Sequence, residues 1–410
     1  MHLTRRDLFA GAAGTAALNI ALDARPARAA DAQRDVLVVI FQRGAADWLQ
    51  MLSPSGDADY QKARPSIKTT ANGSLGLGTM NGTDLYIAQN APELKALYDA
   101  GSLAFVAATG MYTNDRSHFT CQDKMERGAV DGEPSQLTGW LTRHMNSIRS
   151  TQALPILSTL SSSSSVPVSL LGNTQALAVG NSQAFNVSGG TANAQLIRSL
   201  SAGTSKYEAS ARETLDAVAS LQIGLQTINT AASNSAGYTG GALSTALRSL
   251  AQIIRMKVGL TTATVDFGSW DMHNNLVNEF ATRTTEFSRA IAAFWRDMAD
   301  YQANLTIVTM TEFGRRFQEN ANQGTDHGAA SGMLVLGGGV NGGKLYGTWP
   351  GLGAKQLVNG GDLAVTTDYR QVLAEIITTR HGETQLGTVF PTIKYSPLGL
   401  TRQAQPAASF

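Results

Sequence analysis

Asp35-Val-Leu-Val-Val-Ile-Phe41 is the stretch of sequence that decides the fold class. A continuous apolar run of this length suits a strand that is buried on both faces of a parallel sheet, because a strand with one solvated face would alternate polar and apolar residues. The loop after it, residues 42–48, contains Arg43, Gly44 and Asp47. Open α/β sheets bind their ligands at the carboxyl ends of their strands, so this loop is a candidate site.

Helix and strand patterns alternate along much of the chain. Residues 91–100 predict a helix with Pro92 near its start and Gly101 as its stop, and Leu103 to Ala108 predict the next buried strand. This alternation predicts right-handed crossovers and a mostly parallel central sheet with helices on both faces. The other predicted elements are strands at 264–270, 305–310 and 333–336 and helices at 117–128, 280–301 and 369–379.

The middle of the chain has a different composition. Residues 158–165 are rich in serine, and residues 201–259 are rich in alanine and contain neither histidine nor tryptophan. Alanine favours helix, so we interpret a segment at about 150–262 as a Ser/Ala-rich helical insertion within one α/β domain that spans residues 30–410.

The composition excludes several classes of function. Lys+Arg number 32 against Asp+Glu 31, a balance that gives no general attraction for nucleic acid or anionic lipid. Hydrophobic residues make up 43% and charged residues 15%, which predicts a folded protein. Cys121 is the only cysteine, so an internal disulfide and a cysteine-based zinc cluster are both excluded. Any metal must be held by His, Asp and Glu.

The first 29 residues resemble an export signal. Arg5 and Arg6 precede a charge-free apolar run from Leu8 to Ile20, and Ala27-Arg28-Ala29 offers a cleavage site between small residues. The paired arginines resemble a twin-arginine signal, which implies the twin-arginine export machinery as a partner, whereas the alternative is an ordinary Sec signal. We expect a periplasmic or otherwise exported, soluble mature protein, because its remaining sequence has no apolar run long enough for a membrane span.

Polar clusters follow or precede the predicted strands. Asp271-Met272-His273 follows one strand, residues 311–315 with Glu312 and Arg315 follow the next, and Asp326-His327 precede the one after. A divalent cation needs carboxylate oxygens and imidazole nitrogens of this kind. One Asp-His pair on a loop is more often a surface feature, but three clusters at successive strand ends favour a metal or polar active site.

Ser117-His118 allows two interpretations. Ser117 stands where a helix N-cap is expected, with His118 packing in the first turn. A hydroxyl at a helix N-terminus also has free backbone amides and a positive dipole end beside it, which suits attack on a phosphate or a similar anion. The two interpretations are compatible.

Several motifs together resemble a known family of exported proteins, the domain-of-unknown-function family numbered 1501, which is placed in the alkaline phosphatase and sulfatase superfamily. The resemblance spans nearly the whole mature chain and implies an alkaline-phosphatase-like three-layer α/β sandwich with divalent metals at the carboxyl edge of its sheet, used on phosphate or sulfate esters. The motifs are Arg116-Ser117-His118-Phe119, Gly139-Trp140-Leu141, Asp271-Met272-His273, Thr311-Glu312-Phe313-Gly314-Arg315 with Asn320, Gly324-Thr325-Asp326-His327-Gly328, residues 336–340 and Thr367-Asp368-Tyr369-Arg370.

The sequence differs from the superfamily pattern at two places. Asp271 and His273 are separated by one residue where the superfamily has three, and Glu312-Phe313-Gly314 stands where it usually has Asp-His-Gly. These differences favour a single oxygen-rich site, for which manganese, magnesium or calcium would compete with zinc. The predicted metal ligands are Asp47, Asp271, His273, Glu312, Asp326 and His327.

The leading hypothesis is an exported metal-dependent hydrolase of a phosphate, sulfate or related ester. Ser117 would be its nucleophile, and Arg315 would steady the developing charge through its guanidinium group. The substrate would be a small anionic ester or a polysaccharide. Cys121 lacks the proline and arginine pattern of formylglycine sulfatases, which argues against that class. The alternative hypothesis is a non-catalytic envelope protein that uses the scaffold to bind a partner or a polysaccharide.

Overall fold

The apolar run at residues 35–41 forms a strand in the middle of the central sheet. The computed structural model describes residues 35–182 and 186–404, and the predicted signal peptide at residues 1–29 lies outside them. The strands of this sheet are β1 (Val36–Phe41), β5 (Leu103–Gly110), β6 (Thr159–Ser161), β7 (Leu177–Ala178), β8 (Thr262–Asp266), β9 (Leu305–Met310), β10 (Ser331–Gly337), β11 (Leu345–Tyr346) and β12 (Thr367–Asp368).

The sheet is mostly parallel. Its strand order is β11-β5-β10-β9-β1-β8-β6-β7, with β12 paired to β5. β10 pairs antiparallel with β5 and with β9, and the other pairings described for this sheet are parallel. The predicted α/β class is therefore confirmed.

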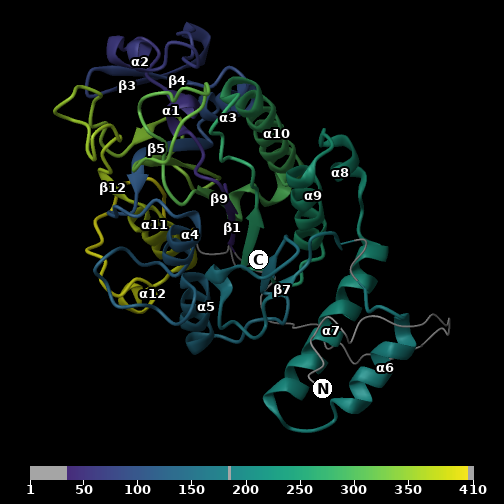
Figure 1. Cartoon of the computed structure of the whole chain (residues 1–410). Coiled ribbons are helices and arrows are strands. Elements are labelled where there is room, and N and C mark those ends of the chain that lie inside the picture. Colours follow the sequence, from purple (N-terminus) through teal and green to yellow (C-terminus); the bar gives the residue numbers. More distant parts are fainter. Residues whose placement is uncertain (1–34, 183–185, 405–410) are drawn as a thin grey trace.

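Side chains of β1 alternate between the two faces of the sheet, and each face is covered by helices (Figure 1). Val36, Val38 and Ile40 belong to one apolar cluster, while Leu37 and the next two odd positions belong to another. The first cluster includes residues of α3 (Pro92–Asp99), α9 (Ala242–Arg255) and α10 (Leu276–Asp297); the second includes residues of α4 (His118–Glu126), α5 (Trp140–Thr151), α11 (Tyr369–His381) and α12 (Leu386–Val389). The molecule thus has the expected three layers.

A smaller antiparallel sheet lies at one end of the molecule (Figure 1). Its order is β2-β4-β3, with β2 at Leu52–Ser53, β3 at Gly76–Met80 and β4 at Thr83–Ile87. The short helices α1 (Trp48–Met51) and α2 (Ala58–Ala63) accompany it.

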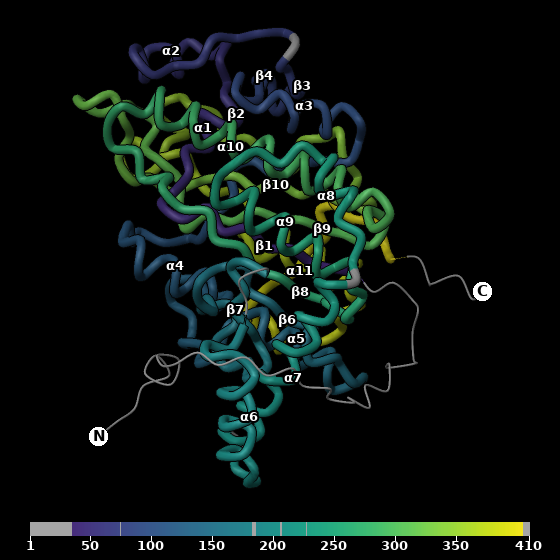
Figure 2. The backbone as a smooth tube through the Cα atoms, turned by 90° about the vertical axis from the view of Figure 1, so that its right-hand side faces the viewer, coloured from purple at the N-terminus to yellow at the C-terminus, as the bar shows by residue number. Residues whose placement is uncertain are grey.

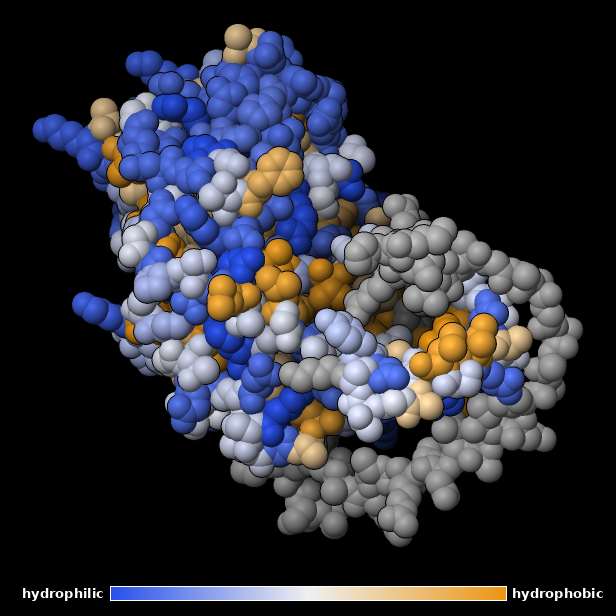
Figure 3. Space-filling model, turned by 60° about the horizontal axis from the view of Figure 1, so that its bottom comes forward, coloured by the Kyte–Doolittle hydropathy of each residue, from blue (hydrophilic) through white to orange (hydrophobic). Residues whose placement is uncertain are grey.

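The segment at 150–262 contains both strands and helices. β6 and β7 join the central sheet, and α9 packs against α10 on one face of it. In contrast, α6 (Gly190–Leu200) and α7 (Lys206–Thr227) form a hairpin that projects from the body, with α8 (Ala231–Ser235) leading back to it (Figures 1 and 2). Leu196, Leu200 and Tyr207 are exposed on the hairpin, and apolar side chains are visible on its surface (Figure 3). The insertion boundaries stay a prediction.

Most predicted elements have close counterparts, with one informative difference. The strand expected at 264–270 is β8, which ends at Asp266. Ser269 has a φ of 66°, a left-handed conformation that an extended strand does not accommodate. The chain therefore leaves the sheet before Trp270. Among the helices of the described ranges, none is both long and apolar enough to cross a membrane.

Removal of one buried side chain of β1 should destabilise the whole sheet. Ile40 is fully buried, so Ile40→Ala is expected to lower the free energy of unfolding by about 2–5 kcal/mol through lost burial and an unfilled cavity. Val277, half exposed on α10, provides the control: Val277→Ala should stay within about 0.5 kcal/mol of the parent. Denaturant unfolding measures both, and equal effects would contradict this arrangement of the core.

Candidate metal centre

The parallel sheet brings the polar clusters to one edge. β5, β8, β1 and β9 all end there, and each is followed by a loop that carries polar residues. β10 runs the other way, so its beginning lies at the same edge, and His327 precedes it by only four residues. Segments that are far apart in the sequence consequently meet where α/β sheets place their sites.

Asp271 is at the centre of this meeting point. Arg315 Nη2 donates a hydrogen bond to its Oδ1 at 2.6 Å, and the Nε2 atoms of His273 and His327 lie 2.9 and 3.2 Å from the same oxygen. His118 Nε2 lies 3.3 Å from Oδ2. Burial opposes ionisation, but the Arg315 hydrogen bond and charge and the neighbouring histidines lower the pKa of Asp271 to about 2. The carboxylate is therefore ionised at neutral pH.

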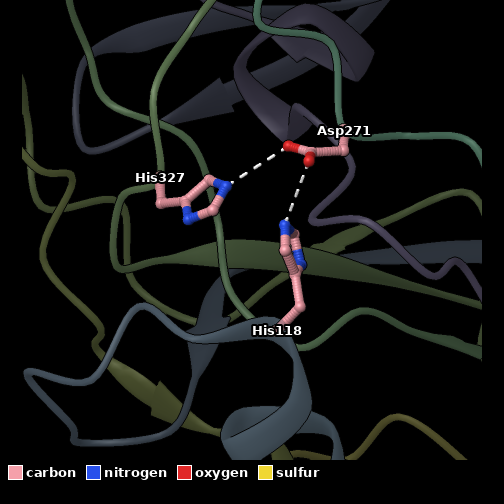
Figure 4. A group of neighbouring side chains, drawn as sticks. All are labelled: His118, Asp271 and His327. Atoms are coloured by element: carbon pink, nitrogen blue, oxygen red, sulfur yellow. Dashed lines mark hydrogen bonds and ion pairs between the residues drawn. The ribbon is translucent and has the colours of Figure 1, made fainter.

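His327 presents a lone pair to Asp271. Its Nδ1 lies 2.8 Å from the backbone carbonyl of Arg116, which can only accept, so we assign the hydrogen to Nδ1. Burial and, after it, the nearby Arg315 charge lower the pKa of His327, which favours the neutral ring. The Nε2 of a neutral ring in this tautomer carries no hydrogen, and it points toward Asp271 (Figure 4). A metal-ligating histidine has this arrangement.

His118 is oriented in the same way by a carboxylate. Its Nδ1 lies 2.7 Å from Oε1 of Glu312, which is fully buried and also accepts from Gly44 N at 2.8 Å and Gln122 Nε2 at 2.7 Å. These hydrogen bonds outweigh burial and lower the pKa of Glu312, while the bond to Glu312 raises the pKa of His118. His118 Nε2 is buried and has no hydrogen-bond partner in the described part of the chain, although it points toward Asp271 (Figure 4).

These three residues fit a divalent cation. One ligand atom each from His118, Asp271 and His327 lies within 4.8 Å of the other two. Two imidazole nitrogens and one carboxylate form the kind of three-residue donor set that leaves further positions open in catalytic metal sites. Phe313 packs against both imidazole rings, with ring-centre distances of 5.0 Å to His118 and 4.9 Å to His327. His118 Nε2 makes no hydrogen bond within the described residues and lies 3.3 Å from Asp271 Oδ2, so a cation held by Asp271 could also bind this nitrogen.

His273 and Asp326 lie at the exposed rim of the cluster. His273 Nδ1 is 3.1 Å from Asp326 Oδ1, and its Nε2 is 3.0 Å from His327 Nε2. Asn320 links the two rim residues, because its Nδ2 donates to Asp326 Oδ1 at 3.1 Å and to the His273 carbonyl at 2.9 Å. The Asn320 hydrogen bond is the main cause of the lowered pKa of Asp326.

Two glycines allow the loops to approach this closely. Gly44 has a φ of +109°, and a Cβ there would lie 2.7 Å from the backbone nitrogen of Asp271. A Cβ on Gly324 would lie 2.1 Å from the carbonyl carbon of His273. Larger residues at either position would push the Asp271 loop away from its neighbours.

Arg315 is a support for Asp271 in this structure. The side chain is buried, and its nitrogens donate to the carbonyls of Gly44, Ala45, Trp270 and Thr325 as well as to Asp271. These bonds occupy the guanidinium group and fix the position of the carboxylate. A direct role for Arg315 in steadying a developing charge stays a prediction.

Asp47 has contacts of a different kind from the other predicted ligands. Its Oδ1 caps α1 by accepting from the backbone nitrogens of Leu49 and Gln50, at 3.0 and 3.2 Å. Its Oδ2 accepts from Arg64 Nη1 at 2.8 Å and from Thr325 Oγ1 at 3.1 Å. Both oxygens are thus engaged by buried protein groups, which gives Asp47 a structural role, and metal binding by Asp47 stays a prediction.

Ser117 caps α4, as its position in the sequence predicts. Its Oγ accepts from Thr120 N at 3.5 Å, and the residue is exposed. Ser117 lies between Arg116, whose carbonyl holds His327, and His118. Ser117 is therefore the neighbour in the chain of two residues that belong to or hold the cluster.

The structure brings together five of the six predicted ligands, Asp271, His273, Glu312, Asp326 and His327, and adds His118. Glu312 acts through His118 here. The sequence pattern placed His118 in the first turn of a helix and did not predict it as a ligand, since its partner Glu312 is 194 positions away. Its place beside Ser117, in a motif shared with the family, was the available signal.

The comparisons with known proteins agree with the motifs. A family model described as "Protein of unknown function (DUF1501)" matches residues 104–389. The chain belongs to this family. No curated protein matches the chain.

The fold is similar to some solved structures, with low TM-scores. The C-terminal periplasmic domain of EcEptC from Escherichia coli, in complex with Zn, is 9% identical, with 74% of this chain and 73% of that chain covered and a TM-score of 0.33. Alkaline phosphatase from the Antarctic bacterium TAB5 is 9% identical, with 74% and 91% covered and a TM-score of 0.30. A variant of that phosphatase with Mg bound in its M3 site is 12% identical, with 74% and 90% covered and a TM-score of 0.31.

Asp47→Asn tests the structural assignment of that residue. The substitution leaves the buried Arg64 guanidinium without its counter-charge, so we expect the free energy of unfolding to fall by about 3–5 kcal/mol. The stoichiometry of bound divalent metal, measured by mass spectrometry on the folded variant, should not change. Loss of metal at unchanged stability would instead make Asp47 a ligand.

Proposed function

We propose that the protein is an exported hydrolase that depends on a divalent cation and cleaves a phosphate, sulfate or related ester. The observation that carries the proposal is the buried Nε2 of His118, which makes no hydrogen bond within the described residues and lies 3.3 Å from the ionised Asp271, beside the lone pair of His327. Export by the twin-arginine machinery is part of the proposal and is supported by the sequence pattern of residues 4–9.

The donor set favours some cations over others. His118 and His327 offer nitrogen, and Asp271 offers oxygen, which suits zinc or manganese better than magnesium or calcium, because the latter two prefer all-oxygen sites. When bound, such a cation would polarise the ester oxygens as a Lewis acid.

The residues around the three ligands have separate roles. Arg315 holds Asp271 in place, and Glu312 fixes the tautomer of His118. His273, oriented by Asp326 at the rim, can hold or move a proton at Nε2. Ser117 Oγ would form the bond to phosphorus or sulfur while the bond to the leaving alcohol breaks, and the proton of the hydroxyl would pass to that alcohol. Water would then cleave the Ser117 ester, and the start of α4 would favour the nearby negative charge.

Asp271→Asn should weaken metal binding. The variant keeps the shape of the side chain but loses the negative charge between the two imidazoles, so we expect the affinity for zinc or manganese to fall at least about ten-fold. The matched control is Asp99→Asn in an exposed ion pair with Lys95, which should bind metal like the parent. Calorimetric titration of the chelator-treated protein measures both.

The same titration can reject the proposal. A folded parent protein that binds no divalent metal and hydrolyses no member of an ester panel would exclude a metal-dependent hydrolase. Metal binding without hydrolysis would favour the non-catalytic alternative, for which the exposed Leu196, Leu200 and Tyr207 of the α6–α7 hairpin offer a partner surface.

The Ser117→Asn variant tests the role of Ser117 as nucleophile separately from its role as helix N-cap. Asparagine is as good an N-cap as serine, so the stability of the protein and its metal content should be preserved, whereas kcat should fall at least about a thousand-fold. Steady-state kinetics on a chromogenic ester, with thermal unfolding as the control, measure both effects. Parent-like kcat in this variant would remove Ser117 from the mechanism.

A further inference from the structure

A cavity of about 430 Å³ lies at the carboxyl ends of β1 and β8, between α4 and the loop at residues 165–168. We infer that it is a subsite for a cationic, ammonium-bearing part of the substrate, an inference that rests on the proposed function for the cleavage itself. The volume falls in the range of small-ligand sites.

The cavity shares a wall with the metal centre. Gln122, one turn after His118 on α4, donates through Nε2 to Glu312 at 2.7 Å and accepts through Oε1 from Arg43 Nη1 at 3.2 Å. Phe119, Gln122, Asp123 and Glu126 follow the spacing of one helix face and line the cavity. A ligand could therefore occupy the cavity while its ester group lies at the metal centre.

Arg43, the arginine that lines the cavity, is already paired with protein groups. Arg43 Nε donates to Asp266 at 2.8 Å, Nη1 donates to Gln122 and Glu126 at 3.2 and 3.3 Å, and Nη2 donates to Glu126 at 3.1 Å. Each nitrogen of the guanidinium group is thus engaged by protein. A phosphate or sulfate group would have to break these bonds to be held here.

The remaining charge of the lining is negative. Asp123, Glu126 and Asp266 face one lining arginine, and the side chains of Asp123 and Asp266 are 47% and 30% exposed. Asp123 also pairs with Arg127, on the next turn of α4, at 2.8 Å, which still leaves three carboxylates against two guanidinium groups. The lining therefore has a small net negative charge, which favours a cation over an anion.

The apolar part of the lining includes one aromatic side chain. Phe119 is 87% exposed although it borders the cavity, and Val166, Pro167 and Val168 lie in the loop on the other side. An aromatic ring beside carboxylates is the environment in which proteins bind ammonium groups, because the face of the ring is negative. The substrate class we infer is an ester of an alcohol that carries an amine or quaternary ammonium group.

The test uses choline and its neutral analogue, in which carbon replaces the quaternary nitrogen. Both are titrated into the chelator-treated mature protein and followed by ligand-observed NMR, so that the result does not depend on the metal or on hydrolysis. We expect choline to bind at least about five-fold more tightly than the neutral analogue, because the shapes match and only the charge differs.

Two variants locate the binding. Phe119→Leu keeps an apolar side chain but removes the ring, and it should weaken choline roughly two- to five-fold. Tyr207→Leu, at an aromatic residue that is 86% exposed on α7, should leave the affinity unchanged. Equal affinity for the two ligands, or equal effects of the two variants, would overturn the subsite. Because the hydrolase is tested by metal and ester assays, failure of one proposal would be distinguishable from failure of the other.

Discussion

The ionised carboxylate of Asp271 is the group on which the arrangement of the site depends. Arg315 brings a positive charge to it from the loop after β9, and His118 and His327 bring imidazoles from α4 and from the segment before β10. Without this negative charge, the buried Arg315 guanidinium would lose the carboxylate that pairs with it. The buried guanidinium of Arg315 and the carboxylate of Asp271 therefore support one another.

The antiparallel strand β10 has a specific part in this geometry. A parallel strand at that position would carry the residues that precede it to the opposite edge of the sheet. Because β10 is reversed, the segment with Asp326 and His327 lies beside the loop with Glu312 and Arg315, and an isolated bridge joins Arg315 to His327. The reversed direction of β10 thus brings His327 to the same sheet edge as the loops that follow the parallel strands.

Much of the central sheet could be predicted from the sequence, since β1, β5, β9 and β10 are buried on both faces and consist largely of apolar runs. β6 could not, because Thr159–Ser161 is short and mostly hydroxylic, and its pairing with β8 and β7 makes it a strand. The convergence of the polar clusters at one sheet edge could also be predicted, from the direction of the strands. The ion pair of Asp47 with Arg64 could not be predicted, because Arg64 lies in the small antiparallel region and has no sequence signal.

Arg64 makes further contacts besides its ion pair with Asp47. Its Nε and Nη2 donate to the carbonyls of Phe317 and Arg316, at 2.9 Å each, within residues 311–330, which contain neither helix nor extended strand. Gly328 N also donates to Gly314 O at 2.8 Å across the same segment. Proteases cut irregular backbone that can detach and extend into their clefts. This long connection is held along its length instead, so limited proteolysis should spare it and leave Arg315 and His327 on the same fragment.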